Sequence, residues 1–309
     1  MGRLVSLLPV MLVVVVVAFL LLRLMPGDPA TAMLPITAQL WEIEELRSQL
    51  GLDRPLPIQF LHFLGRTVRG DLGESLFFRI PVSELISQRF ESTFLLAGTS
   101  MLLAVLIGVP VGVWAANRRG TLLDQLLMAS SLISVSMPSF WLGLILILAF
   151  AVHRPWFPVT GWTSISENPM KTMRFLVLPT VTMGLSVAAV IARMVRSSML
   201  EVLSQDYIRT GRAKGMAYRW LLYKHALRNA MIPMMAAIGL SFAGLLGGAA
   251  VTETVFTIPG LGSLMVDSVA RRDYPVLQAL LILFALINML VHLIIDLSYV
   301  LVDPRIRID

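Results

Sequence analysis

The sequence predicts an all-α polytopic membrane protein with six transmembrane helices and both termini in the cytoplasm. Its composition indicates a membrane protein, because 57% of the 309 residues are hydrophobic and only 14% are charged, whereas soluble domains average about 45–50% and about 25%. Long apolar runs recur along the chain, and basic residues gather in alternate connections between them. Nothing outside these runs predicts a separate soluble domain, so we expect a single transmembrane domain over residues 1–309.

Six runs are long and apolar enough to cross a bilayer, which takes about 20 residues. The first follows Arg3 and resembles a secretory signal peptide, but it exceeds the usual apolar core of about 7–15 residues. We therefore expect it to remain as a span. The six runs are Leu4–Leu22, Phe94–Ala116, Leu126–Val152, Phe175–Ala192, Ala230–Thr252 and Val276–Val302.

The short connections set the orientation, because Lys and Arg accumulate on the cytoplasmic side of a membrane. One set of connections and termini carries 13 basic residues and the other carries five. The richer set includes Arg3, the loop 193–229 and Arg305, so both termini are expected inside. The formal charge of +6 then reflects topology and does not indicate a nucleic-acid partner.

The connection from Arg23 to Arg89 faces outward and is too long to be a simple loop. Turn signals and helical patterns alternate in it. They predict a turn at Pro26–Pro29, a helix over Gln39–Leu50 stopped by Gly51, a helix over Pro57–Val68, and a third helix begun by Pro81. We expect a helical periplasmic loop that caps the outer mouth, within residues 1–93, followed by a five-span core in residues 94–309.

Two spans carry glycines four residues apart, Gly108 with Gly112 and Gly244 with Gly248. Small residues at this spacing let helices approach closely in lipid. They fit either packing within the chain or a face for a second subunit.

Polar interruptions in the spans mark a candidate translocation path. Ser134, Ser136 and Pro138 break the third span, and such a break is tolerated where protein or water surrounds it. In the last span His292 and Asp296 share a helix face, which fits a structural pair or a role toward solute or gate. The candidate path residues are Ser134, Ser136, Met137, Pro138, Asn288 and His292.

The densest positive charge lies between Asp206 and Pro233, in a connection that the charge rule places in the cytoplasm. Ser204 or Asp206 suits the cap of a helix start, and Gly215 suits a helix stop. The pattern predicts a short, capped, basic helix level with the membrane surface. Such a helix is suited to receive force from another protein.

Residue types that carry covalent chemistry are scarce. The chain has no cysteine, which excludes disulfides, thiolate metal sites and a cysteine nucleophile. It has neither a G-x-x-x-x-G-K-[ST] sequence nor an H-E-x-x-H sequence, and its four histidines are scattered. We therefore expect no catalytic residue, no metal site and no ATP bound by this chain.

Motifs along nearly the whole chain resemble one family. The segment YIRTGRAKG at Tyr207–Gly215, followed by HALRNAMIP at His225–Pro233, resembles the EAA loop of bacterial binding-protein-dependent ABC importers, and is most similar to permeases for dipeptides, oligopeptides and nickel. Further matches are Pro26–Pro29, Gly70–Ser75, Ser136–Trp141, Pro259–Gly262, Arg272–Pro275 and Asp303–Arg305. Gly211 departs from the alanine usual in that family and should loosen the helix slightly, because glycine costs about 1 kcal/mol there.

The resemblance implies a type I ABC importer permease fold in the bacterial inner membrane, as the first permease of a pair. It implies a sibling permease, two ATP-binding subunits that hold ATP and Mg, and a periplasmic or surface-anchored solute-binding protein. Closure of the ATPases would pull the coupling helices together and rock the spans from inward-open to outward-open. The ATPase-coupling residues that the resemblance implies are Asp206, Tyr207, Arg209, Thr210, Gly211, Arg212, Ala213, Lys214 and Gly215.

Other function classes fit the sequence less well. A secondary transporter or channel usually carries ionisable residues at the midplane of its spans, and five of the six runs have none. A membrane-embedded enzyme would need a nucleophile with its base, or a metal cluster, and neither is apparent. The solute is left open between di- or oligopeptides, nickel chelates, glutathione and small oligosaccharides, because selection lies largely in the binding protein.

Overall fold

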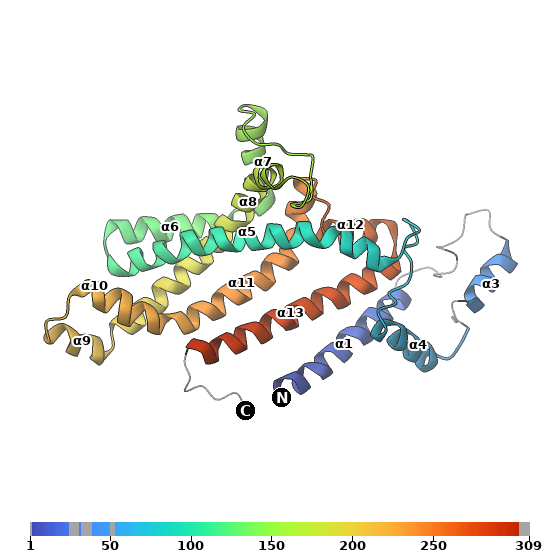
Figure 1. Cartoon of the computed structure of the whole chain (residues 1–309), viewed down its shortest axis with the longest axis horizontal. Helices are drawn as coiled ribbons and strands as arrows, with labels where there is room; N and C mark the ends of the chain where they lie inside the picture. Colours follow the sequence, from blue (N-terminus) through green and yellow to red (C-terminus); the bar gives the residue numbers. More distant parts are fainter. Residues whose placement is uncertain (1, 25–30, 32–38, 50–52, 303–309) are drawn as a thin grey trace. The chain divides into compact units, whose positions relative to one another are not determined.

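The computed structural model of the chain is helical (Figure 1). It describes residues 2–24, 31, 39–49 and 53–302. Apart from one isolated bridge between Glu74 and Pro81, every regular element that these residues form is a helix. The chain divides into two compact units: unit 1 is Met1–Glu91 with Ser263–Met289, and unit 2 is Ser92–Gly262 with Leu290–Ile308.

Among the residues that the structure describes, four helices are long and apolar enough to cross a membrane, or five if one bent pair of helices counts as a single span. The four are α5 (Val82–Asn117), α8 (Pro169–Leu203), the run Tyr218–Val255 that ends in α11 (Leu227–Val255), and α13 (Tyr274–Val302). A shorter apolar stretch, Pro9–Leu21, lies in α1 (Gly2–Leu24). The helical membrane fold is confirmed, and the number of six spans and the sidedness of the termini stay predictions.

The bent pair lies where the sequence predicts a break in the third span. Helix α6 (Leu122–Ser136) and the helical stretch Ser139–Val152, which begins with α7 (Ser139–Ile147), differ in direction by 95°. Proline disfavours the helical conformation of the residue before it, and Met137 is accordingly extended, with φ −76° and ψ 127°. The single run Leu126–Val152 is thus replaced by two helices, and a π-helical turn, η1 (Leu148–Val152), follows α7.

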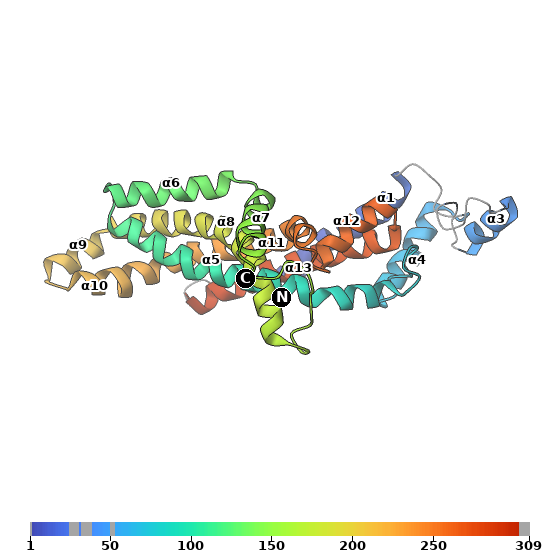
Figure 2. The ribbon, with the colours of Figure 1, turned by 90° about the horizontal axis from the view of Figure 1, so that it is seen from above.

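Helix α8 is the centre of unit 2 and packs against α6, α7 and α11. Helix α6 lies alongside α8 in both views (Figures 1 and 2). Two arginine–carboxylate contacts join these helices: Nε of Arg196 lies 2.6 Å from Oδ1 of Asp124, and Nη2 lies 2.8 Å from Oδ2. The Asp124 side chain is only 4% exposed, so the pair compensates a carboxylate that would otherwise be buried without a partner.

The two pairs of spaced glycines have different surroundings. A Cβ atom at Gly108 would lie 2.7 Å from the carbonyl oxygen of Ala188, and one at Gly112 would lie 2.6 Å from that of Ala192. The first pair therefore serves packing of α5 on α8 within the chain. At Gly244 and Gly248 of α11 an added Cβ would meet no atom within 4 Å. A role of that second pair toward another subunit stays a prediction.

Unit 1 contains the helices expected in the long connection. Helix α3 (Leu40–Gln49) and helix α4 (Leu56–Val68) match the two predicted short helices, and α5 begins directly after Pro81. The predicted turn at Pro26–Pro29 and the stop at Gly51 lie outside the described residues. Phe19 of α1 packs against α4, with ring centroids 5.4 Å from Phe60 and 5.7 Å from Phe63. Whether this part caps an outer mouth stays a prediction.

An exposed ion pair closes the end of α4. Nε of Arg66 lies 2.8 Å from Oδ2 of Asp71. The Arg66 guanidinium, together with the N–H of Gly73, lowers the pKa of Asp71. The pKa of Asp71 is lower in the folded chain than in the unfolded chain, where it is about 3.9. The ion pair therefore stabilises the turn fully at pH values above about 3.9, and this stabilisation is lost as the pH falls through the folded pKa.

We predict that Gly112→Ala lowers the melting temperature of the purified protein in detergent. Alanine gains about 1 kcal/mol of helix propensity, but the added methyl group would press on backbone and β-branched atoms of α8, and overpacking costs about 1–3 kcal/mol. Gly248→Ala is the matched control, since it gains the same propensity without a clash. Equal shifts of the two melting temperatures would contradict the close α5–α8 contact.

Candidate functional site

The basic segment folds as a helical hairpin between α8 and α11. Helix α9 (Asp206–Ala213) is followed by the short helix α10 (Tyr218–Trp220) and by a π-helical turn, η2 (Leu221–Ala226), which continues into α11. Within unit 2, both views place α9 and α10 at the ends of α8 and α11 (Figures 1 and 2). The predicted helix over Asp206–Gly215 is therefore present, two residues shorter.

Helix α9 begins at Asp206 as predicted, but its cap differs from the prediction. Its cap residue is Gln205, which makes no side-chain capping bond. The hydroxyl of Ser204 instead donates to the carbonyl of Glu201 at the end of α8, at 2.7 Å. Asp206 lies in the first turn, where the negative charge of a carboxylate interacts favourably with the helix dipole.

The end of α9 is as predicted. Gly215 has φ +78°, a conformation that glycine adopts without steric cost. Its N–H donates to the carbonyl of Arg212 at 3.1 Å, and the N–H of Met216 donates to that of Gly211 at 3.1 Å. These two bonds turn the chain back toward η2.

One face of α9 is docked on η2. Ile208 is 1% exposed and Leu221 is 2% exposed, and Gly211 between them is buried. A Cβ atom at Gly211 would lie 2.8 Å from Cδ2 of Leu221. The missing side chain at Gly211 therefore permits the close approach of η2. The loosening expected from this glycine stays a prediction.

The other coupling residues point to solvent. Asp206, Tyr207, Arg209, Thr210, Arg212, Ala213, Lys214 and Gly215 are all exposed. Three contacts restrain this face without covering it. Arg209 pairs with Asp206 at 3.2 Å, the Arg212 guanidinium lies 5.3 Å from the ring centroid of Tyr218, and Nδ2 of Asn229 donates to the Tyr207 hydroxyl at 2.7 Å.

The residues that hold the hairpin together are not among the coupling residues that the sequence motifs indicate. Ile208, Leu221 and Leu222 form the docked face, and Asn229 ties the start of α11 to Tyr207. A signal was present, because Ile208 is the one large aliphatic residue of α9 and two leucines follow the glycine turn. An exposed cleft of about 340 Å³ lies next to the hairpin, lined by Arg219, Trp220, Tyr223 and Lys224.

The candidate path residues come from two places. Ser134, Ser136, Met137 and Pro138 gather at the break between α6 and α7, where the hydroxyl of Ser134 donates to its own helix. Asn288 and His292 lie one turn apart on α13. The amide of Asn288 donates to the carbonyl of Phe284 at 3.1 Å, and His292 is exposed.

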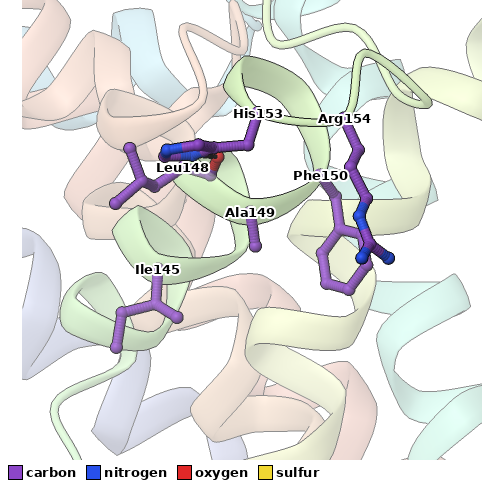
Figure 3. Close-up of a pocket in the computed structure, with 6 residues that line it drawn as sticks. All are labelled: Ile145, Leu148, Ala149, Phe150, His153 and Arg154. Carbon is purple, nitrogen blue, oxygen red and sulfur yellow. Dashed lines mark hydrogen bonds between the residues drawn. The ribbon is translucent and has the colours of Figure 1, made fainter.

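Two apolar cavities lie near these helices. One of about 420 Å³ is at the end of α7 and η1 (Figure 3), where a ring nitrogen of His153 lies 2.7 Å from the carbonyl oxygen of Leu148. Arg154 and Phe150 stand at its rim (Figure 3). The other, of about 290 Å³, lies among α5, α11 and α13. None of the six candidate path residues lines either cavity, so the path assignment stays a prediction.

Within the described ranges, no group of three or more His, Asp or Glu side chains is gathered closely enough to hold a metal ion.

Comparison with known proteins identifies the family. Residues 108–308 match the model of the binding-protein-dependent transport system inner membrane component, and residues 1–97 match its N-terminal companion model. The chain belongs to this family. It is a permease component of an ABC importer, as the order of its motifs predicts.

Individual relatives match over almost the whole chain. It is 47% identical over 305 residues to the probable peptide ABC transporter permease protein y4tP of Sinorhizobium fredii. It is 45% identical to the glutathione transport system permease protein GsiC of Escherichia coli K12 and of Salmonella typhimurium. Each alignment covers 99% of this chain and 97% of the relative.

A solved structure supports the fold. The permease superimposes on a chain of the inward-facing MetNI methionine ABC transporter with a TM-score of 0.58, over 71% of this chain and 97% of that chain. The two chains are 22% identical, so this likeness concerns the fold alone.

We predict that Ile208→Ala releases α9 from η2. Truncating a fully buried isoleucine costs about 2–5 kcal/mol. A loss of about 2 kcal/mol should raise amide hydrogen exchange in α9 on the order of 30-fold, because the helix then opens locally. Arg209→Ala is the control on the exposed face and should leave the exchange rates nearly unchanged. Similar exchange in both variants would show that Ile208 does not hold the hairpin.

Proposed function

We propose that this permease forms half of the translocation pathway of a peptide importer and is driven by ATPase subunits that bind α9. The docked and exposed faces of α9 carry the proposal. Ile208 and Gly211 fix the helix to η2, while Arg209, Arg212 and Lys214 face outward. A helix held on one side and cationic on the other suits an acidic groove on a partner.

The packing offers a direct route for force into the membrane part. Helix η2 continues without interruption into α11, and the whole run Tyr218–Val255 reads as one apolar membrane helix. Protein interiors are densely packed and compress little. A displacement of α9 is therefore expected to move the start of α11 instead of being absorbed between them. The rocking of the spans that follows opens the pathway alternately to each side.

The partners follow from the family. We propose a sibling permease, two ATP-binding subunits that carry ATP and Mg, and a solute-binding protein at the periplasmic or outer surface. The chain lies in the bacterial inner membrane with α9 and both termini in the cytoplasm. It performs no covalent chemistry itself, because ATP hydrolysis belongs to the ATP-binding subunits. The matching family is named for binding-protein dependence, which supports this set.

The proposed solutes are di- and oligopeptides. The relatives bear names of peptide and glutathione permeases. Glutathione is itself a tripeptide, so both names describe transport of short peptides. A test is uptake of labelled dipeptides, oligopeptides and glutathione by the complete transporter reconstituted in liposomes. Uptake without ATP-binding subunits would instead identify a channel or carrier.

We predict that Arg212→Glu and Lys214→Glu uncouple ATP hydrolysis from uptake. Charge reversal places an acid against the acidic groove expected in the ATPase, and a tenfold loss of uptake corresponds to about 1.4 kcal/mol. ATPase activity and uptake are measured on the same proteoliposomes, and insertion is checked by membrane fractionation.

Arg118→Glu is the control for this prediction, because Arg118 is an exposed cation of the loop between α5 and α6. It should leave both activities unchanged. Unchanged uptake in both α9 variants would exclude α9 as the coupling element.

A further inference from the structure

The exposed cleft beside the hairpin is lined by two cations and two aromatic side chains. Arg219, Trp220, Tyr223 and Lys224 surround a volume of about 340 Å³. Trp220 is 58% exposed and Tyr223 is 52% exposed, although both are large rings. Arg219 and Lys224 are also exposed, and Nζ of Lys224 lies 4.9 Å from the centroid of the Trp220 ring. We name these four residues the hairpin cleft.

The backbone that carries the hairpin cleft is anchored in the core of unit 2. Leu221 and Leu222 separate Trp220 from Tyr223 in the sequence, and both leucines are buried in the main hydrophobic cluster. Because residues four apart share a helix face, Trp220 lies next to Lys224, as their contact shows. The two leucines face inward, so the lining side chains are held on the outward face of a fixed backbone.

The lining groups are almost all hydrogen-bond donors. Arginine, lysine and the indole N–H of tryptophan donate and do not accept, whereas the tyrosine hydroxyl does either. No Asp or Glu occurs between Asp206 and Glu253, so this segment supplies no carboxylate that would neutralise Arg219 and Lys224. An anion with several acceptor oxygens complements such a lining. Phosphate is an anion of this kind, and arginine and lysine are its usual protein ligands.

The hairpin cleft lies where a membrane helix passes from its polar to its apolar part. Turn η2 continues into α11, whose uncharged stretch begins at Ala230. Lys224 is six residues earlier, which is about 9 Å at 1.5 Å per residue. The headgroup layer on each side of a bilayer is about 5–8 Å thick, and the long side chains of Lys and Arg near helix ends extend to it. Trp and Tyr are enriched at the same level.

We propose that the hairpin cleft binds the phosphate of an anionic phospholipid such as phosphatidylglycerol. Arg219 and Lys224 bind the phosphate oxygens, and the rings of Trp220 and Tyr223 pack against the headgroup while their N–H and hydroxyl groups donate to it. This site goes beyond the proposed function, because coupling and transport assign no role to these residues. All four belong to unit 2, and the site requires no particular side of the membrane.

The charge of the cleft selects among lipids. Phosphatidylcholine also carries a phosphate, but its choline cation would be repelled by Arg219 and Lys224. A quaternary ammonium group binds over aromatic rings, and the Trp220 ring is already occupied by Lys224. The cleft therefore favours a headgroup with a net negative charge.

The test measures lipid binding to the full-length permease, purified alone and in the complete transporter, after bound lipid has been removed. Native mass spectrometry gives the dissociation constants of phosphatidylglycerol and phosphatidylcholine. Phosphatidylglycerol should bind about tenfold more tightly. Arg219→Gln and Lys224→Gln should each raise its dissociation constant about fivefold, which is the contribution of one cation near an anionic lipid surface. Neither substitution should raise the dissociation constant of phosphatidylcholine to the same extent.

Arg209→Gln is the matched control. It removes the same charge from the exposed face of α9, in the same hairpin but outside the cleft. At physiological salt it should change the dissociation constant of phosphatidylglycerol less than about twofold, because exposed charges are screened. An equal effect of all three substitutions shows that lipid is attracted to diffuse positive charge, and it overturns the proposal.

A conservative variant separates loss of the site from loss of the fold. Lys224→Arg keeps the cation and should bind phosphatidylglycerol nearly as tightly as the unmodified chain. The melting temperature without added lipid should be the same in all variants, since the substituted side chains are exposed.

Three results would overturn the proposal. The first is unchanged affinity for phosphatidylglycerol in both Arg219→Gln and Lys224→Gln. The second is displacement of the lipid by millimolar inorganic phosphate, which identifies a site for free phosphate. The third is binding to the isolated permease that disappears in the complete transporter, because a partner protein then covers the cleft. A transporter that binds the lipid but fails to take up peptides contradicts only the proposed function.

Discussion

The contact between α9 and η2 is the constraint on which the proposed function of this permease depends. Ile208 and Leu221 are almost fully buried, and Gly211 leaves room for them to meet. Without that contact the cations of α9 would sit on a loose loop, and a partner that pulled on them would only stretch the loop. With it, the cationic face and the start of α11 move as one body. A small apolar contact therefore allows a force on the charges of α9 to reach α11.

One segment in each unit is fixed by buried groups, and the two units use different interactions for it. The hairpin of α9 is held by apolar packing and glycine, whereas the loop after α4 is held by the buried carboxylate of Asp273. In each case one group of residues is buried and fixes the backbone, and another group of side chains is exposed to solvent. This division explains why the cationic residues are accompanied by residues that never reach the surface.

Much of this fold could be predicted from the sequence. Apolar runs indicate the helices, Pro138 indicates the break between α6 and α7, and Gly215 indicates the end of α9. Each of these signals acts on residues that are close in the sequence. The pairing of Arg196 with Asp124 and the docking of Ile208 on Leu221 could not be predicted, because they join residues whose proximity is created by packing. The predicted cap of α9 was wrong for a related reason, since the Ser204 hydroxyl donates to the carbonyl of Glu201 at the end of α8.

The π-helical turn η2 between the hairpin and α11 has a geometric consequence. A π turn holds one residue more than an α turn and is rare except as a local insertion. Removing that residue from Leu221–Ala226 would rotate everything before it by about 100° about the axis of α11, since an α-helix has 3.6 residues per turn. The direction in which the arginines of α9 point around the axis of α11 is therefore set by the one extra residue of the π turn, and not by the arginines themselves.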